Sequence, residues 1–257
     1  MQLFSLVGFS ILIAGTGLPG IDFLRLGARD VAIVILAGIL NVFGLMQLYR
    51  AFSIGNMSLA APIAGSYPIF TILLGFLILG EGIGLEKGMA IAIVITGVIL
   101  TGVGTGAQVA GQIEIWNSSA VASALTAAIF FGAAYLCLDE GVGYLGSIIS
   151  VWLVRLGAVF FVFPFLLLTM KKVLLPRRGA WKWIVVMTIL DSAGFIALTF
   201  GYALAGGSPA VVTTLSSLLG AVTTILATVI YKDRLTPIQM LGIIILFLGV
   251  IIVLNVP

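Results

Sequence analysis

Two ionisable side chains lie far from the ends of the apolar runs that contain them. Arg155 falls near the middle of the run Tyr144–Leu168, and Asp191 falls near the middle of the run Trp181–Leu204. A charge at mid-membrane depth costs about 2.5–3.5 kcal/mol on insertion scales, and such charges therefore tend to serve a function. We expect both residues to face a cavity inside a membrane bundle rather than lipid.

The residue types suggest two kinds of chemistry and leave a structural alternative for each. The Arg155 guanidinium presents a planar set of donors that suits a substrate carboxylate. Alternatively, Arg155 is a buried partner of Asp191 or of helix-end carbonyl groups, or it extends to the membrane surface. Asp191 is a candidate coupling site, because a low-dielectric environment helps a carboxylate to exchange a proton for substrate. Its alternative role is the salt bridge to Arg155.

Other polar and aromatic residues are candidates for the walls of a binding pocket. Each of them is also explained by helix packing or by the preference of aromatic rings for the membrane interface. These candidates are Asn41, Gln47, Ser66, Tyr67, Trp152 and Tyr202.

The remaining residue types exclude several classes of protein. The chain has no histidine and one cysteine, Cys137, which argues against imidazole catalysis, a disulfide and a zinc site, and we expect no metal and no cofactor. The glycines at Gly102, Gly104 and Gly106 lack the strand and the lysine of a phosphate-binding loop, so a nucleotide site is not expected. The basic residues are scattered over predicted loops, which fits membrane topology better than a nucleic-acid partner.

Composition places these residues in a membrane. The chain has 257 residues, of which 61% are hydrophobic and 8% charged, and its mean hydropathy is +1.30. A soluble domain carries about 25% charged residues, so this chain has too little polar surface for a globule in water. Each membrane crossing by a helix takes about 20 apolar residues. We therefore expect an all-α membrane protein.

Nine apolar runs are long enough to be helices, whereas a barrel strand needs only about ten alternating residues. The predicted helices are Leu3–Leu18, Val31–Tyr49, Met57–Leu79, Gly88–Val103, Ser119–Leu138, Tyr144–Leu168, Trp181–Leu204, Pro209–Tyr231 and Pro237–Val256. Pro209 and Pro237 fit the first turn of a helix, where the missing N–H costs little. A loop is predicted at Asp139–Gly143, with Gly141 and Gly143 as turn residues.

The two halves of the chain are similar to each other when one is shifted by 150 residues. This offset places Asn41 on Asp191, Gly44 on Gly194 and Ser66 on Ser216, and a two-residue slip then places Glu81 on Asp233 and Gly97 on Gly249. Residues 1–105 form a first repeat of four helices, and residues 119–257 form a second repeat of five. Because five is an odd number, complete copies insert in opposite orientations, as in secondary transporters built from inverted repeats.

Two corresponding blocks carry a resemblance to a known family. They read AFSIGNMSLAAPIAGSYPIFTILLGFLILGEGIGLEKGMAIAIVITGVILTG and YALAGGSPAVVTTLSSLLGAVTTILATVIYKDRLTPIQMLGIIILFLGVIIV. Both resemble the EamA-type repeat of the drug/metabolite transporter superfamily. The resemblance implies a ten-helix carrier, five helices per repeat, with both ends in the cytoplasm. This chain would then lack the first helix of its first repeat, and it has Asp233 where a glutamate is usual.

The leading hypothesis is a secondary active transporter, not an enzyme, that exports an amino acid or related metabolite across a bacterial or archaeal plasma membrane. Its expected partners are the substrate, membrane lipid and, as a candidate coupling ion, protons. A broad-specificity carrier of drugs or cations is the main alternative, and a channel or a membrane-embedded enzyme is a weaker one. The positive-inside rule places the loop around Lys171–Lys182 in the cytoplasm and the C-terminus outside, whereas the resemblance implies a cytoplasmic C-terminus. Orientation, substrate and oligomeric state stay open.

Overall fold

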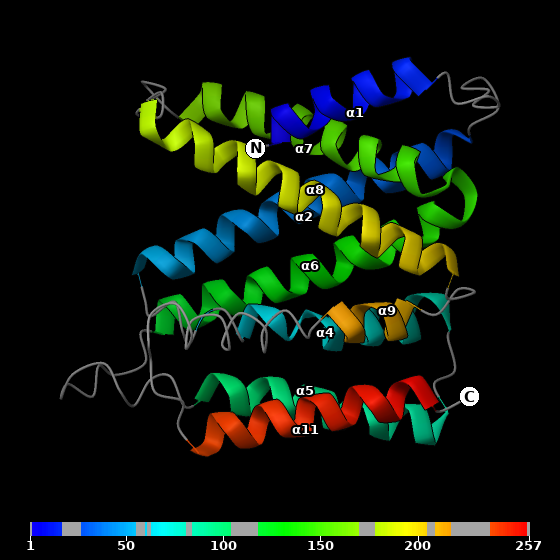
Figure 1. The fold of residues 1–257 in the computed structure, drawn as a ribbon, viewed down its shortest axis with the longest axis vertical. Coiled ribbons are helices and arrows are strands. Elements are labelled where there is room, and N and C mark those ends of the chain that lie inside the picture. Colours follow the sequence, from blue (N-terminus) through cyan, green and yellow to red (C-terminus); the bar gives the residue numbers. More distant parts are fainter. Residues whose placement is uncertain are drawn as a thin grey trace. The chain divides into compact units, whose positions relative to one another are not determined.

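The structure, a computed structural model, describes residues 2–16, 27–54, 60, 63–80, 84–103, 118–169, 178–204, 209–216 and 237–255. All elements within these ranges are helical, and the expected all-α class is confirmed for them (Figure 1). The α-helices are α1 (Gln2–Thr16), α2 (Ala28–Ile54), α4 (Tyr67–Leu74), α5 (Leu85–Val103), α6 (Ser118–Leu145), α7 (Ser147–Thr169), α8 (Trp181–Leu204), α9 (Pro209–Ser216) and α11 (Pro237–Asn255). A π-helical turn follows α4 at Gly75–Leu79, and a 3-10 turn precedes α8 at Arg178–Ala180.

Several helices have the length and composition of membrane spans. Four segments of the described chain are long and apolar enough to cross a bilayer, namely Ala28–Ile54, Ser119–Leu145, Ser147–Pro164 and Trp181–Leu204. Shorter apolar helices cover Gln2–Gly15, Ile63–Ile78, Gly88–Gly97 and Met240–Gly249. Each of these segments overlaps a predicted run, although Gln2–Gly15, Ala28–Ile54 and Ser119–Leu145 extend beyond its bounds. Pro209 and Pro237 are the first residues of α9 and α11, as predicted. The total of nine spans stays a prediction.

The distribution of residues on α8 is the reverse of that in a soluble protein. The large apolar residues Ile189 and Leu190 are 62% and 67% exposed. The buried positions of α8 are Thr188, Phe195, Thr199 and Tyr202, three of which carry a hydroxyl group. Such an apolar outer face is unfavourable in water and suits lipid. The helix therefore presents its polar groups to the protein interior.

The structure corrects the predicted loop at Asp139–Gly143. Helix α6 continues through these residues to Leu145, and the chain turns at Gly146, which has φ +76. A left-handed residue is cheap only for glycine, so a single Gly146 is enough to separate α6 from α7. Gly141 and Gly143 are helical, and a Cβ on Gly141 would lie 1.9 Å from Cγ2 of Val34. Gly141 therefore serves close helix packing rather than a turn.

The predicted continuous helix Met57–Leu79 is interrupted at Ser66. The amide of Ser66 bonds to the Ile63 carbonyl, and the chain resumes as α4 with Pro68 in its first turn. Because proline has no N–H, Pro68 cannot donate the hydrogen bond that a continuous helix would need there. The break therefore lies at Pro68, the residue that the sequence marks as removing an internal hydrogen bond from this predicted helix.

Packing divides the chain into two compact units. Unit 1 comprises Met1–Val42 and Leu136–Gly207, and unit 2 comprises Phe43–Tyr135 and Ser208–Pro257. The division falls inside α2 and α6 and differs from the two sequence repeats. The repeat boundaries at 1–105 and 119–257 therefore stay a prediction from the sequence.

In unit 1, α2 and α7 are in contact through a glycine on each helix. A Cβ on Gly38 would lie 2.2 Å from the carbonyl oxygen of Val154, and one on Gly157 would lie 2.4 Å from that of Ile35. The two contacts move three residues forward on one helix and three back on the other, so α2 and α7 run antiparallel. Backbone approach of this kind requires small residues, and it fixes the part of α7 that carries Arg155.

In unit 2, α5 and α11 lie side by side (Figure 1). A Cβ on Gly97 would lie 2.5 Å from the backbone nitrogen of Leu246, and one on Gly249 would lie 2.9 Å from that of Val94. Val94 and Leu246 also belong to one buried cluster. Here again the second contact is three residues back on α5 and three forward on α11, so these two helices are antiparallel.

Candidate functional site

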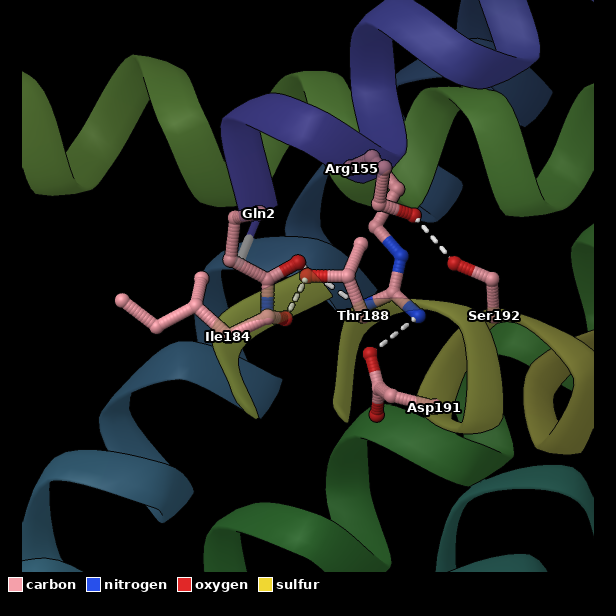
Figure 2. A network of polar contacts seen from close by, with 7 residues as sticks. Gln2, Arg155, Ile184, Thr188, Asp191 and Ser192 are labelled. Atoms are coloured by element: carbon pink, nitrogen blue, oxygen red, sulfur yellow. Dashed lines mark hydrogen bonds and ion pairs between the residues drawn. The ribbon is translucent and has the colours of Figure 1, made fainter. Parts of the chain in front are cut away.

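Arg155 and Asp191 form an ion pair inside unit 1. The Arg155 side chain reaches from α7, and its Nη2 lies 2.8 Å from Oδ2 of Asp191 on α8 (Figure 2). Arg155 is 0% exposed, so it does not extend to the membrane surface. The structure therefore forms the salt bridge that the sequence left as one of several alternatives.

The guanidinium has two further partners, one on α1 and one on α8. Its Nη1 donates a hydrogen bond of 2.7 Å to Oε1 of Gln2, which Figure 2 shows beside it. Its central carbon lies 4.2 Å from the ring centroid of Phe195. A carboxylate, an amide oxygen and an aromatic face together replace the water that this cation loses on burial.

Hydroxyl groups surround the ion pair on the same helices. Ser5 of α1 and Ser192 of α8 share a hydrogen bond of 2.7 Å, and Thr188 donates to the carbonyl of Ile184 at 2.7 Å. The sequence interpretation missed Gln2 and Ser5. Their spacing of three places them on one face of α1, which was the available signal.

The two members of the pair differ in exposure. The side chain of Arg155 is 0% exposed, whereas that of Asp191 is 33% exposed. The carboxylate is therefore the more exposed member of the pair. Both terminal nitrogens of the Arg155 guanidinium have protein partners, Nη1 with Gln2 and Nη2 with Asp191.

Unit 1 also holds three other predicted site residues. Asn41 on α2 is 4% exposed, and Tyr202 on α8 is 3% exposed. Trp152 lies one helical turn before Arg155 on α7, and its Nε1 donates a hydrogen bond of 3.0 Å to Ser10 of α1. Trp152 therefore joins α1 to α7 close to the ion pair.

The other three predicted site residues belong to unit 2. Ser66 donates a hydrogen bond of 2.6 Å to the Ile63 carbonyl, which is a local contact at the helix break. The Tyr67 hydroxyl is hydrogen bonded to Ser216, and the Tyr67 ring lies 4.9 Å from that of Tyr135, centroid to centroid. Gln47 on α2 is partly buried. In this unit, side chains from α4, α6 and α9 meet around Tyr67.

Some sequence predictions lie outside the described residues. These include Glu81 and Asp233, which the repeat comparison aligns with each other. In the part of the chain that the structure describes, His, Cys, Asp and Glu side chains nowhere gather in a group of three or more that could hold a metal ion.

Helices with apolar exposed faces, buried hydroxyl groups and a fully buried, paired arginine are typical of an integral membrane protein. The model of the EamA-like transporter family matches residues 1–103 and again residues 118–255. The chain therefore belongs to the EamA-like transporter family, and the resemblance drawn from its two sequence blocks is confirmed. This family consists of membrane transporters of the drug/metabolite superfamily.

Solved structures show the same fold. One of them, described only as a crystal structure of a protein, shares 15% sequence identity with a TM-score of 0.70. The match covers 98% of this chain and 84% of that chain. At this identity the likeness concerns the fold alone. No curated protein matches the chain.

Proposed function

We propose that this protein is a secondary active transporter that exports a small organic metabolite, an amino acid or a related compound, across a bacterial or archaeal plasma membrane. Transport is coupled to protons and proceeds by alternating access. The substrate-binding and coupling site lies around Arg155 and Asp191 in unit 1.

The observation that carries this proposal is the intramembrane ion pair. Asp191 is held by Arg155 at 2.8 Å, and 33% of its side chain is still exposed; in this proposal the exposed part of the carboxylate faces the substrate path. A purely structural pair would serve equally well if both members were buried. Ionisable groups inside membrane helices that are paired and accessible are typical of proton relays and substrate pathways.

The packing of α5 against α11 supports the alternating-access mechanism. Gly97 and Gly249, which correspond in the two sequence repeats, contact Leu246 and Val94, which also correspond. Equivalent helices therefore pack antiparallel and reciprocally. This is the arrangement expected of two copies inserted in opposite orientations, which rock around a shared site.

Substitution of Asp191 by asparagine tests the coupling role. D191N keeps the size and hydrogen-bonding capacity of the side chain but removes the group that gains and loses a proton. We expect pH-gradient-driven transport to be abolished, while exchange of substrate across the membrane persists. The measurement uses proteoliposomes and a mixture of the twenty common amino acids, isotopically labelled, with and without an imposed pH gradient.

The matched control is T96A, because Thr96 is exposed on α5 and its hydroxyl donates a local hydrogen bond to the Ala92 carbonyl. This variant should keep gradient-driven transport. Unchanged proton dependence in D191N would reject the coupling role of Asp191. Comparison of extracellular metabolites between overexpressing and deletion strains then identifies the exported compound and tests the direction of transport.

A second candidate function is efflux of lipophilic cations. It is favoured by the difference in exposure within the ion pair, since the negative member is the one that a ligand reaches. Ethidium efflux from overexpressing cells tests it. Strong ethidium efflux that is lost in D191N, without any effect on amino acids, would favour this function over the first.

A further inference from the structure

Gln2 contacts Arg155 but has no role in the proposed function as described so far. Its amide oxygen accepts a hydrogen bond of 2.7 Å from Nη1 of Arg155, while Asp191 is paired with Nη2. The two partners use different nitrogens of the guanidinium and approach from different helices, α1 and α8 (Figure 2). Both contacts therefore exist at the same time, and neither has to give way to the other.

A proton-coupled cycle creates a difficulty for Arg155. When Asp191 takes up a proton or binds a cationic group, the guanidinium loses the negative charge opposite it. Arginine stays protonated, and it is 0% exposed here, so water does not take over that role. A buried charge that loses its partner is strongly destabilising. Some neutral group must then hold the cation in place.

We infer that Gln2 is the positioning residue that holds Arg155 when Asp191 is neutral or engaged with substrate. This inference rests on the proposed function, because it assigns Gln2 a task within that cycle. The glutamine amide does not titrate, so its hydrogen bond persists through the whole cycle. The Phe195 ring, 4.2 Å from the guanidinium, supports the cation from another side.

In the described part of unit 1, Arg155 is the charged residue that forms an ion pair with Asp191. Helix α1 contributes Gln2 and Ser5, and α8 contributes Thr188 and Ser192. None of these four side chains titrates near neutral pH. The charge balance of the site therefore depends on the two members of the pair, and Gln2 acts without changing it.

A double-mutant cycle measures this dependence without any substrate. Q2A is made in the natural chain and in D191N, and unfolding of each purified protein in detergent is followed as temperature rises. Q2A should lower the midpoint only slightly in the natural chain, because Asp191 still holds Arg155. In D191N it should lower the midpoint severalfold more. Equal shifts in both backgrounds would overturn the inference.

A rescue variant separates positioning from general loss of structure. Q2E places a carboxylate of the same length against Nη1, so Q2E/D191N again has a negative charge beside Arg155. We expect Q2E/D191N to regain the amino-acid exchange that Q2A/D191N loses, by about fivefold or more, a coupling typical of residues in one network. It should not regain gradient-driven transport, because position 191 still cannot carry a proton. Exchange as low as in Q2A/D191N would overturn the inference.

S10A is the matched control on α1. Ser10 accepts a hydrogen bond from Trp152, so it joins α1 to α7 through a contact that involves neither Arg155 nor Asp191. Its effect should be the same in both backgrounds. If Q2A/D191N gives no folded protein while each single variant folds, that result also supports the inference. Gradient-driven transport by D191N would overturn the coupling role of Asp191, whereas an additive thermal cycle overturns the role of Gln2, so the two failures are distinguishable.

Discussion

The Arg155 guanidinium binds groups from two other helices, α1 and α8. The free-energy cost of burying its charge depends on all of these partners. A buried ion pair gains little over an apolar pair of the same volume, but removal of one partner leaves an uncompensated charge. The pair is therefore weak evidence for stability. The presence of the Arg155–Asp191 pair fits a functional requirement for charge at this position better than a requirement for a stable fold.

Variants of the pair test this view at the level of stability. R155L leaves Asp191 without its cation and should destabilise the protein by about 3 kcal/mol. R155L/D191L removes both charges and should recover most of that loss while remaining inactive in transport. The measurement is the amount of monodisperse protein extracted in detergent and its thermal unfolding. A double variant as unstable as R155L would contradict the expectation.

The sequence was sufficient to find the pair but not all of its partners. Arg155 and Asp191 stand out because each lies at the middle of an apolar run. Gln2 lies at the start of its helix, where a polar residue needs no explanation, and Phe195 is one of 16 phenylalanines. Their roles depend on how α1 and α8 pack against α7, which no local pattern in the sequence records.

Among the elements, α6 contains two glycines, Gly141 and Gly143, that have opposite effects on stability. Gly141 faces Val34 of α2 so closely that a methyl group has no room, whereas a Cβ on Gly143 would meet nothing within 4 Å. Both residues are inside the helix. The first is required for packing, and the second only weakens the helix relative to alanine.

Alanine substitutions at these two positions should therefore have opposite signs. G141A should destabilise the protein by about 1–3 kcal/mol through overpacking. G143A should stabilise it by about 0.5–1 kcal/mol through higher helix propensity. Thermal unfolding of both variants in detergent provides the comparison. Destabilisation by both would indicate instead that the chain turns at these glycines.

Helix identity was more predictable than helix ends. Long apolar runs mark the helices because lipid requires the backbone to satisfy its own hydrogen bonds. The acidic pair Asp139 and Glu140 resembled a loop, yet Glu140 is paired with Arg29 at 3.8 Å and lies within α6. Tertiary partners thus allowed charged residues to stay helical. The interruption at Ser66 followed from Pro68, whose effect depends on its place in the helix.

On the scale of the whole molecule, the Arg155–Asp191 pair is present in only one of the two repeats. The offset of 150 places Ser5 at the position of Arg155 and Asn41 at that of Asp191. The ion pair thus has an uncharged counterpart, Ser5 and Asn41. In the proposed mechanism, this twofold architecture would therefore contain one titratable coupling group at this site, Asp191, rather than two.

Thiol labelling tests the orientation of the repeats. After Cys137 is replaced by alanine, cysteine is introduced at Leu85 or at Ile238, which are 79% and 48% exposed near the starts of α5 and α11. Because α5 and α11 are antiparallel, the two positions should lie on opposite sides of the membrane. In intact cells, a membrane-impermeant maleimide should label only one of them.

Permeabilised cells provide the control, since both positions should then react. Labelling of both positions, or of neither, in intact cells would contradict opposite insertion of the two copies. The side that is labelled also decides between the two orientations that the basic residues and the family resemblance favour.

The reciprocal contact of Gly97 and Gly249 has a consequence for how such a chain could arise. Each helix contributes one glycine and, three residues before it, one aliphatic residue: Val94 and Gly97 on α5, and Leu246 and Gly249 on α11. The glycine of each helix contacts the aliphatic residue of the other. A surface of this kind is complementary to itself under a twofold rotation. An ancestral unduplicated polypeptide bearing this surface would already satisfy the geometry for pairing with an identical, oppositely inserted molecule, and gene fusion would then have made a pre-existing partnership permanent.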